Sequence, residues 1–82
     1  MRQAIITRFI GPTNHKGSRI KATADAGTVI ISWDYNQDVP ANHMRAASAL
    51  ASKYGWLEHN QLIGGGMPSK HRDAYCFVQV PK

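Results

Sequence analysis

The sequence predicts a single small α+β domain in which one helix packs on one face of a mainly antiparallel sheet of about five strands. Short segments rich in β-branched and aromatic residues flank one longer segment with helical periodicity. The chain has 82 residues, of which 43% are hydrophobic and 18% are charged, so it is long enough for one folded domain and too short for two. We therefore expect the order strand, strand, strand, helix, strand, strand in one domain that spans residues 1–82.

Three strands are expected before the helix. Residues 3–10 form a run that is too short for a typical helix, and its apolar residues on both faces are typical of a central strand. Residues 18–24 alternate strictly, and a short connection at residues 25–27 leads into a third strand at residues 28–33, which predicts a hairpin. The alternation separates an apolar set from a wet, cationic set: Ile20, Ala22 and Ala24 against Arg19, Lys21 and Thr23.

The one clear helix is expected at residues 41–54. Pro40 suits its first turn and Gly55 suits its C-terminal end. Its apolar residues recur at helical spacing and form one stripe, which consists of Met44, Ala47, Leu50, Ala51 and Tyr54.

Two more strands are expected after the helix. Residues 60–63 form a short strand, and residues 64–73, which begin with three glycines, predict a flexible basic loop. Residues 74–80 form the last strand, which a proline ends. Most aromatic side chains are expected in the core, whereas Tyr35 and Trp56 border turns and are the candidates for exposure.

Positive charge is concentrated at the two ends of the chain. Residues 1–21 contain no acid and carry +5, residues 22–60 carry −2, and residues 61–82 carry +2. A basic surface of this kind favours nucleic acid, anionic nucleotides or an acidic protein as partner. We expect the cations of residues 18–24, together with Arg8, to populate the sheet face opposite the helix, as a binding surface or a dimer interface.

The loop from Gly11 to Gly17 concentrates the most unusual chemistry. Its amides, an imidazole and cations can form an anion-binding nest, although the P-loop spacing is absent and a purely structural turn explains the same residues equally well. A second basic cluster, Lys70-His71-Arg72, follows the three glycines. It could bind a phosphate backbone, or it could be a solvated loop that only keeps the domain soluble. The candidate binding residues are Arg8, Asn14, His15, Lys16, Arg19, Lys21, Lys70 and Arg72.

The sequence predicts no catalytic residue, no cofactor and no metal site. The four histidines are His15, His43, His59 and His71. None stands at a recognisable ligand spacing, and the C-x-x-C and H-E-x-x-H arrangements are absent. Because the acids are also scattered, we expect a protein that is not an enzyme. The alternative is a small nuclease in which His15 or His71 is the base and Lys16 or Arg19 stabilises charge.

Cys76 is the only cysteine, which excludes an intramolecular disulfide and is typical of a reducing compartment. Its apolar neighbours predict a buried strand position, where the thiol packs as a small hydrophobe. No apolar run approaches the roughly 20 residues of a membrane span, and a signal-peptide hydrophobic region is absent. We therefore expect a soluble protein of the cytoplasm without a membrane partner.

Several motifs carry a resemblance to other proteins. They are Gly11-Pro12-Thr13-Asn14, Gly17-Ser18-Arg19-Ile20-Lys21-Ala22, the alanine-rich helix, Trp56, Leu62-Ile63-Gly64-Gly65-Gly66 and the aromatic last strand. Over nearly the whole chain they resemble a family of small uncharacterised proteins encoded by phages, plasmids and other mobile elements. Short accessory proteins of such elements are often inhibitors of host defence, including anti-CRISPR proteins, so the resemblance implies that role in the host cytoplasm.

The expected function is inhibition of a host defence complex by a basic binding face. The partner would be an acidic protein surface or the nucleic acid held in that complex. A stand-alone nucleic-acid-binding module is the alternative, and it predicts binding to DNA or RNA that weakens steeply with salt. A homodimer through the open sheet face is a further possibility.

Overall fold

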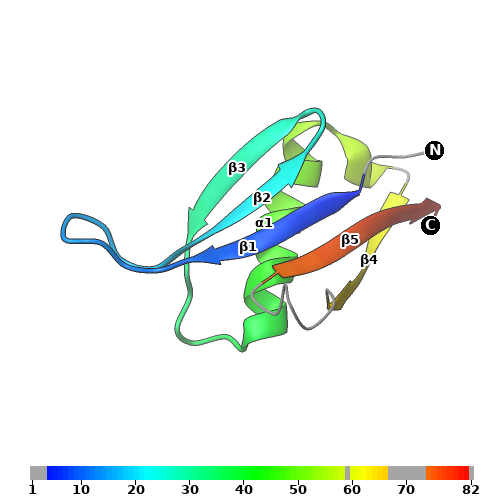
Figure 1. Cartoon of the computed structure of the whole chain (residues 1–82). Coiled ribbons are helices and arrows are strands. Elements are labelled where there is room, and N and C mark those ends of the chain that lie inside the picture. Colours follow the sequence, from blue (N-terminus) through cyan, green and yellow to red (C-terminus); the bar gives the residue numbers. More distant parts are fainter. Residues whose placement is uncertain (1–3, 59, 67–73, 82) are drawn as a thin grey trace.

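In the computed structural model, which describes residues 4–58, 60–66 and 74–81, five antiparallel strands form one open sheet with a single α-helix on one face (Figure 1). The elements are β1 (Ile5–Ile10), β2 (Arg19–Ala24), β3 (Gly27–Ser32), α1 (Val39–Lys53), the short 3-10 helix η1 (Trp56–Glu58), β4 (Asn60–Gly66) and β5 (Ala74–Pro81). The predicted α+β class is confirmed. The strand order across the sheet, β3-β2-β1-β5-β4, differs from the order along the chain.

The sheet is built around β1, which pairs with β2 on one side and with β5 on the other. Ile5 and Thr7 are buried, whereas Ile6 and Arg8 are exposed on the opposite face. The apolar residues on both faces of β1 thus belong to a central strand, as the sequence predicts. The two edges of the sheet are β3 and β4.

Local signals fix both ends of α1. The Asp38 side chain accepts a hydrogen bond from the backbone N–H of Ala41 at 2.8 Å and caps the helix, and Pro40 lies in the first turn. Gly55 follows the last turn with a φ of 72°, a conformation that glycine adopts without strain. Figure 1 shows α1 behind the sheet, and it packs mainly over β1, β2 and β3. No helix among the described residues is long and apolar enough to cross a membrane.

The buried side of α1 differs from the predicted stripe. Ala47, Leu50 and Ala51 are buried as predicted, but Met44 and Tyr54 are 36% and 38% exposed. The helix residues that are buried are Asn42, His43, Ala46, Ala47, Leu50 and Ala51. A search for an apolar stripe leaves out polar residues, so it misses the two that lie against the sheet.

Hydrogen bonds allow these two polar side chains to be buried. Thr7 Oγ1 and His43 Nδ1 lie 2.6 Å apart beneath the helix, and the His43 ring packs on that of Tyr75 with a centroid distance of 4.2 Å. The Asn42 amide donates to the carbonyl of Asp34 and accepts from its backbone N–H. Since buried polar groups are normally paired, these bonds stabilise the packing of α1 and of the β3–α1 connection.

The three glycines belong to β4, so the predicted loop at these positions is wrong. Gly64, Gly65 and Gly66 pair with β5. The ring of Phe77 occupies the space that a Cβ on Gly64 would need, so glycine at this position permits close packing rather than a turn. The rest of the predicted loop, residues 67–73, lies outside the described residues, and β5 includes its proline instead of ending before it.

Candidate binding surface

The sheet face opposite α1, named the open face below, carries several of the predicted cations. Arg8 on β1 and Lys21 on β2 are direct register partners, and both are exposed. Arg19 lies on the same face, diagonal to Arg8. Alternation along β2 explains this arrangement, because Ile20 and Ala22 then point to the helix side and are buried.

Arg8 and Lys21 border a shallow hollow of about 240 Å³, whose other lining residues are Ile6 and Thr23. Two like charges directly opposite each other on neighbouring strands destabilise a sheet. Neither cation has a hydrogen-bond or ion-pair partner within the described part of the chain. The hollow therefore offers a guanidinium, an ammonium and a hydroxyl group to one anionic group from outside.

The described carboxylates lie outside the strands of the sheet. Asp25 is in the β2–β3 turn, Asp34 and Asp38 precede α1, and Glu58 is in η1. At the described strand positions of the open face there is no Asp or Glu. The potential of this face is therefore positive and attracts anionic partners.

Arg19 differs from the other two cations in its burial. It is half buried at the start of β2, opposite Ile10 and Ser32. Its Nε atom is buried and has no hydrogen-bond partner among the residues that the structure describes. An unpaired buried donor is destabilising, and no described residue of this chain offsets that cost for the Nε atom.

The loop between β1 and β2 projects beyond the sheet (Figure 1). The Thr13 N–H donates to the carbonyl of Lys16 at 2.7 Å, and Thr13 Oγ1 accepts from the N–H groups of His15 and Lys16 at 3.3 and 3.1 Å. These two amides are used within the loop, so the predicted anion-binding nest cannot include them as free donors. Asn14, His15 and Lys16 are nevertheless exposed at the tip, where a partner can reach their side chains.

The base of this loop is tied to the β3–α1 connection. Tyr35 Oη donates to Ser18 Oγ at 2.9 Å, and the Trp33 N–H donates to the carbonyl of Ser18 at 3.1 Å. The rings of Phe9 and Trp33 pack edge to face at 5.0 Å between centroids. Of the two aromatic residues that were candidates for exposure, Tyr35 is 76% exposed and Trp56 is half buried.

An aliphatic patch adjoins the cations and was not predicted. Ile6, Ile63 and Val78 are 40%, 55% and 45% exposed, and the strand register connects them, because Ile63 faces Val78 while Cys76 faces Ile6. Cys76 is half buried on the open face, which corrects its predicted place in the core. Since β5 is apolar at most positions, its alternation gives no sign of which side chains α1 covers.

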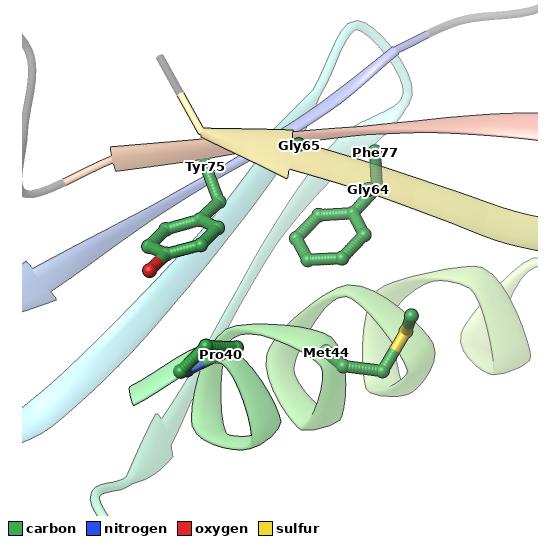
Figure 2. Close-up of a pocket in the computed structure, with 6 residues that line it drawn as sticks. All are labelled: Pro40, Met44, Gly64, Gly65, Tyr75 and Phe77. Atoms are coloured by element: carbon green, nitrogen blue, oxygen red, sulfur yellow. The ribbon is translucent and has the colours of Figure 1, made fainter. Parts of the chain in front are cut away.

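A second hollow lies on the helix side of the sheet, between the first half of α1 and strands β4 and β5 (Figure 2). Its volume is about 180 Å³, and it is lined by Pro40, Met44, Gly64, Gly65, Tyr75 and Phe77. The groove lies where α1 makes its fewest contacts with the sheet, because α1 packs mainly over the other three strands. Its lining carries no charged side chain, so it does not extend the basic surface.

The histidines are not brought together by the part of the fold that is described. His43 is bonded to Thr7 in the core, and His15 lies at the loop tip beside Lys16. Among the described residues no group of three or more His, Cys, Asp or Glu side chains could hold a metal. Four predicted residues lie outside the described residues: His59, Lys70, His71 and Arg72. The nuclease hypothesis stays a prediction.

Comparison with known proteins gives no match: no family model, no curated protein and no solved structure matches this chain. The fold and the surface define its class, a small α+β protein with one helix-covered sheet face and one open, basic face. The resemblance to mobile-element proteins stays a prediction. The function must therefore be argued from the chemistry of the open face.

Proposed function

We propose that this chain is a non-enzymatic binding protein of a phage or another mobile element, which inhibits a host defence complex by covering a functional surface of that complex. The observation that carries the proposal is the cross-strand pair of Arg8 and Lys21 on an uncovered sheet face whose described positions hold no carboxylate. Such a face is complementary to an acidic surface, and complementary charge speeds association and selects the partner. The projecting loop, with His15 and Lys16, extends the area of contact.

The test is phage plating on a host with an active CRISPR defence that expresses this chain. We expect the wild type to restore plating and the Lys16→Glu, Arg19→Glu, Lys21→Glu triple variant to lose this effect. Because Arg19 is half buried, circular dichroism must show that the variant is folded, and Lys21→Glu alone provides a second, milder variant. Full inhibition by a folded triple variant would overturn the proposal.

The matched control reverses a charge elsewhere. Lys53 is exposed at the C-terminal end of α1, where its ammonium group lies 5.5 Å from the centroid of the Tyr54 ring. Lys53→Glu changes the net charge as much as Lys21→Glu does, but it leaves the open face intact. We therefore expect Lys53→Glu to inhibit as the wild type does.

A stand-alone nucleic-acid-binding module is the second candidate, since the hollow between Arg8 and Lys21 could also take a phosphodiester group. This candidate predicts that affinity for DNA or RNA falls steeply between 50 and 200 mM salt, by roughly tenfold or more for every few phosphate contacts. Fluorescence anisotropy measures that dependence. Pull-downs from host lysate with and without nuclease separate the candidates, because only capture through nucleic acid is nuclease-sensitive.

A further inference from the structure

Two adjoining features lie on the open face. One is the cationic hollow beside Arg8 and Lys21, and the other is the aliphatic patch of Ile6, Ile63 and Val78. We propose that the partner of the open face is a protein surface that places a carboxylate between Arg8 and Lys21 and aliphatic side chains against Ile6, Ile63 and Val78. This inference rests on the proposed binding role of the open face and adds the chemical class of the partner.

The hollow suits a carboxylate. The planar guanidinium of Arg8 can donate two parallel hydrogen bonds to its oxygens, and Lys21 supplies a second positive charge from the neighbouring strand. Thr23 adds a hydroxyl group, and Ile6 gives an apolar wall for the methylene groups of an Asp or Glu side chain. An anion in this position also removes the repulsion between the two paired cations.

The aliphatic patch is continuous with the hollow. Ile6 belongs to both, because it lines the hollow and faces Cys76 across the β1–β5 pair. Val78 follows on β5 and pairs with Ile63 on the edge strand β4. An apolar centre beside charged groups is the usual composition of a protein–protein interface.

Nucleic acid is a poorer match for this combination. Sheets that bind single strands present aromatic rings on which bases stack. Here the aromatic side chains of the strands lie on the helix side, where Phe9 packs on Trp33, Tyr75 on His43 and Phe77 in the core. A phosphate backbone on the cations would leave the aliphatic patch in water.

A second copy of this chain is also a poorer match. An isologous dimer through the open face would bring together two surfaces that each carry Arg8, Arg19 and Lys21. The described positions of that face provide no carboxylate for these cations. Charge complementarity therefore favours an acidic partner over self-association.

The test is a nuclear magnetic resonance titration of the full chain with labelled Ile and Val methyl groups. The probe is a short synthetic peptide of alternating Leu and Glu, compared with polyglutamate and with an oligo-dT strand. We expect the Leu-Glu peptide to give saturable shifts of the Ile6, Ile63 and Val78 methyl groups. Lys21→Glu should weaken its binding about tenfold, and Ile63→Thr, which keeps a β-branched side chain, about threefold.

Two variants on the helix side of the molecule serve as matched controls. Lys53→Glu reverses an exposed cation, and Val39→Thr replaces an aliphatic residue that is 48% exposed at the start of α1. Both should bind the peptide as the wild type does. Equal binding of polyglutamate, tighter binding of oligo-dT, methyl shifts that depend on protein concentration alone, or no response to any probe would each overturn the inference.

The inference and the proposed function can fail separately. If the peptide binds as expected and no defence system is inhibited, the partner class stands and the proposed function is wrong. If Lys21→Glu loses inhibition in the plating assay while Ile63→Thr keeps it in full, the proposed function stands and the aliphatic half of the partner is wrong.

Discussion

The two faces of the sheet are made by alternate residues of the same strands, yet they differ in what covers them. On the helix side, Ile5, Ile20 and Phe77 pack with the alanines of α1 and are almost fully buried. On the open face, Ile6 and Val78 remain 40% and 45% exposed, and Arg8 and Lys21 have no ion-pair partner among the residues that the structure describes. The helix-covered face therefore stabilises the fold, whereas the open face carries side chains that folding alone does not require.

The largest expected difference is between the neighbours Ile5 and Ile6. Ile5→Ala leaves a cavity under the helix and should lower the free energy of unfolding by about 2–5 kcal/mol. Ile6→Ala removes a half-exposed side chain and should cost about 1 kcal/mol or less. Urea unfolding followed by circular dichroism measures both, and equal losses would mean that the open face is also part of the core.

Gly64 and Gly65 provide a second matched pair on β4. A Cβ at position 64 meets the Phe77 ring, so Gly64→Ala should lower the free energy of unfolding by about 1–3 kcal/mol. At position 65 a Cβ meets nothing within 4 Å, and among the described residues only Gly55 has a positive φ. Gly65→Ala should therefore raise the free energy of unfolding by about 0.4–1 kcal/mol, because alanine restricts the unfolded chain more than glycine does. If the thermal unfolding midpoints of Gly64→Ala and Gly65→Ala shifted in the same direction, the positions of Gly64 and Gly65 relative to the Phe77 ring would be wrong.

Thr7 on the helix side and Thr23 on the open face allow the loss of one hydroxyl group to be compared between the two faces. Thr7→Val removes the 2.6 Å hydrogen bond to the buried His43 and should lower the free energy of unfolding by about 1–3 kcal/mol, because it takes this partner from a buried ring nitrogen. Thr23 is exposed on the open face, so Thr23→Val should change it by no more than about 0.5 kcal/mol. Chemical denaturation at neutral pH checks both values. A larger loss of stability for Thr23→Val than for Thr7→Val would contradict the assignment of Thr7 to the buried face and Thr23 to the exposed face.

The sequence was informative wherever local chemistry and burial agree. Alternation along β2 separates Ile20 and Ala22 from Lys21 without any knowledge of the sheet, because only one face of that strand is covered. Pro40 and Gly55 act through their own backbone conformation, so the helix ends could also be predicted to within about two residues. The placement of Lys21 and Arg19 on one face follows from the same local rule.

Features that depend on a distant strand could not be predicted in the same way. Gly64 has a local preference for turns, and only its pairing with β5 and the ring of Phe77 make it part of a strand. Cys76 lies in a run that is apolar on both faces, so only its pairing with Ile6 of β1 shows that it belongs to the face opposite α1. His43 has a polar side chain, so its sequence position alone indicates exposure. Its burial depends on the hydrogen bond to Thr7, which lies 36 residues away in the sequence.

The smallest expected effect tests whether the like-charge pair of Arg8 and Lys21 on the open face lowers the stability of the fold. Lys21→Glu converts a like-charge cross-strand pair with Arg8 into an opposite-charge pair, so it should raise the free energy of unfolding by about 0.2–1 kcal/mol at low salt. The gain should fade toward about 1 M salt, where charges are screened within roughly 3 Å. Lys53→Glu should instead destabilise slightly, because it removes a cation from a helix C-terminus and from the Tyr54 ring. A Lys21→Glu variant that is more stable yet no longer binds would assign this cation to recognition, whereas a loss of stability would show that Lys21 supports the sheet itself.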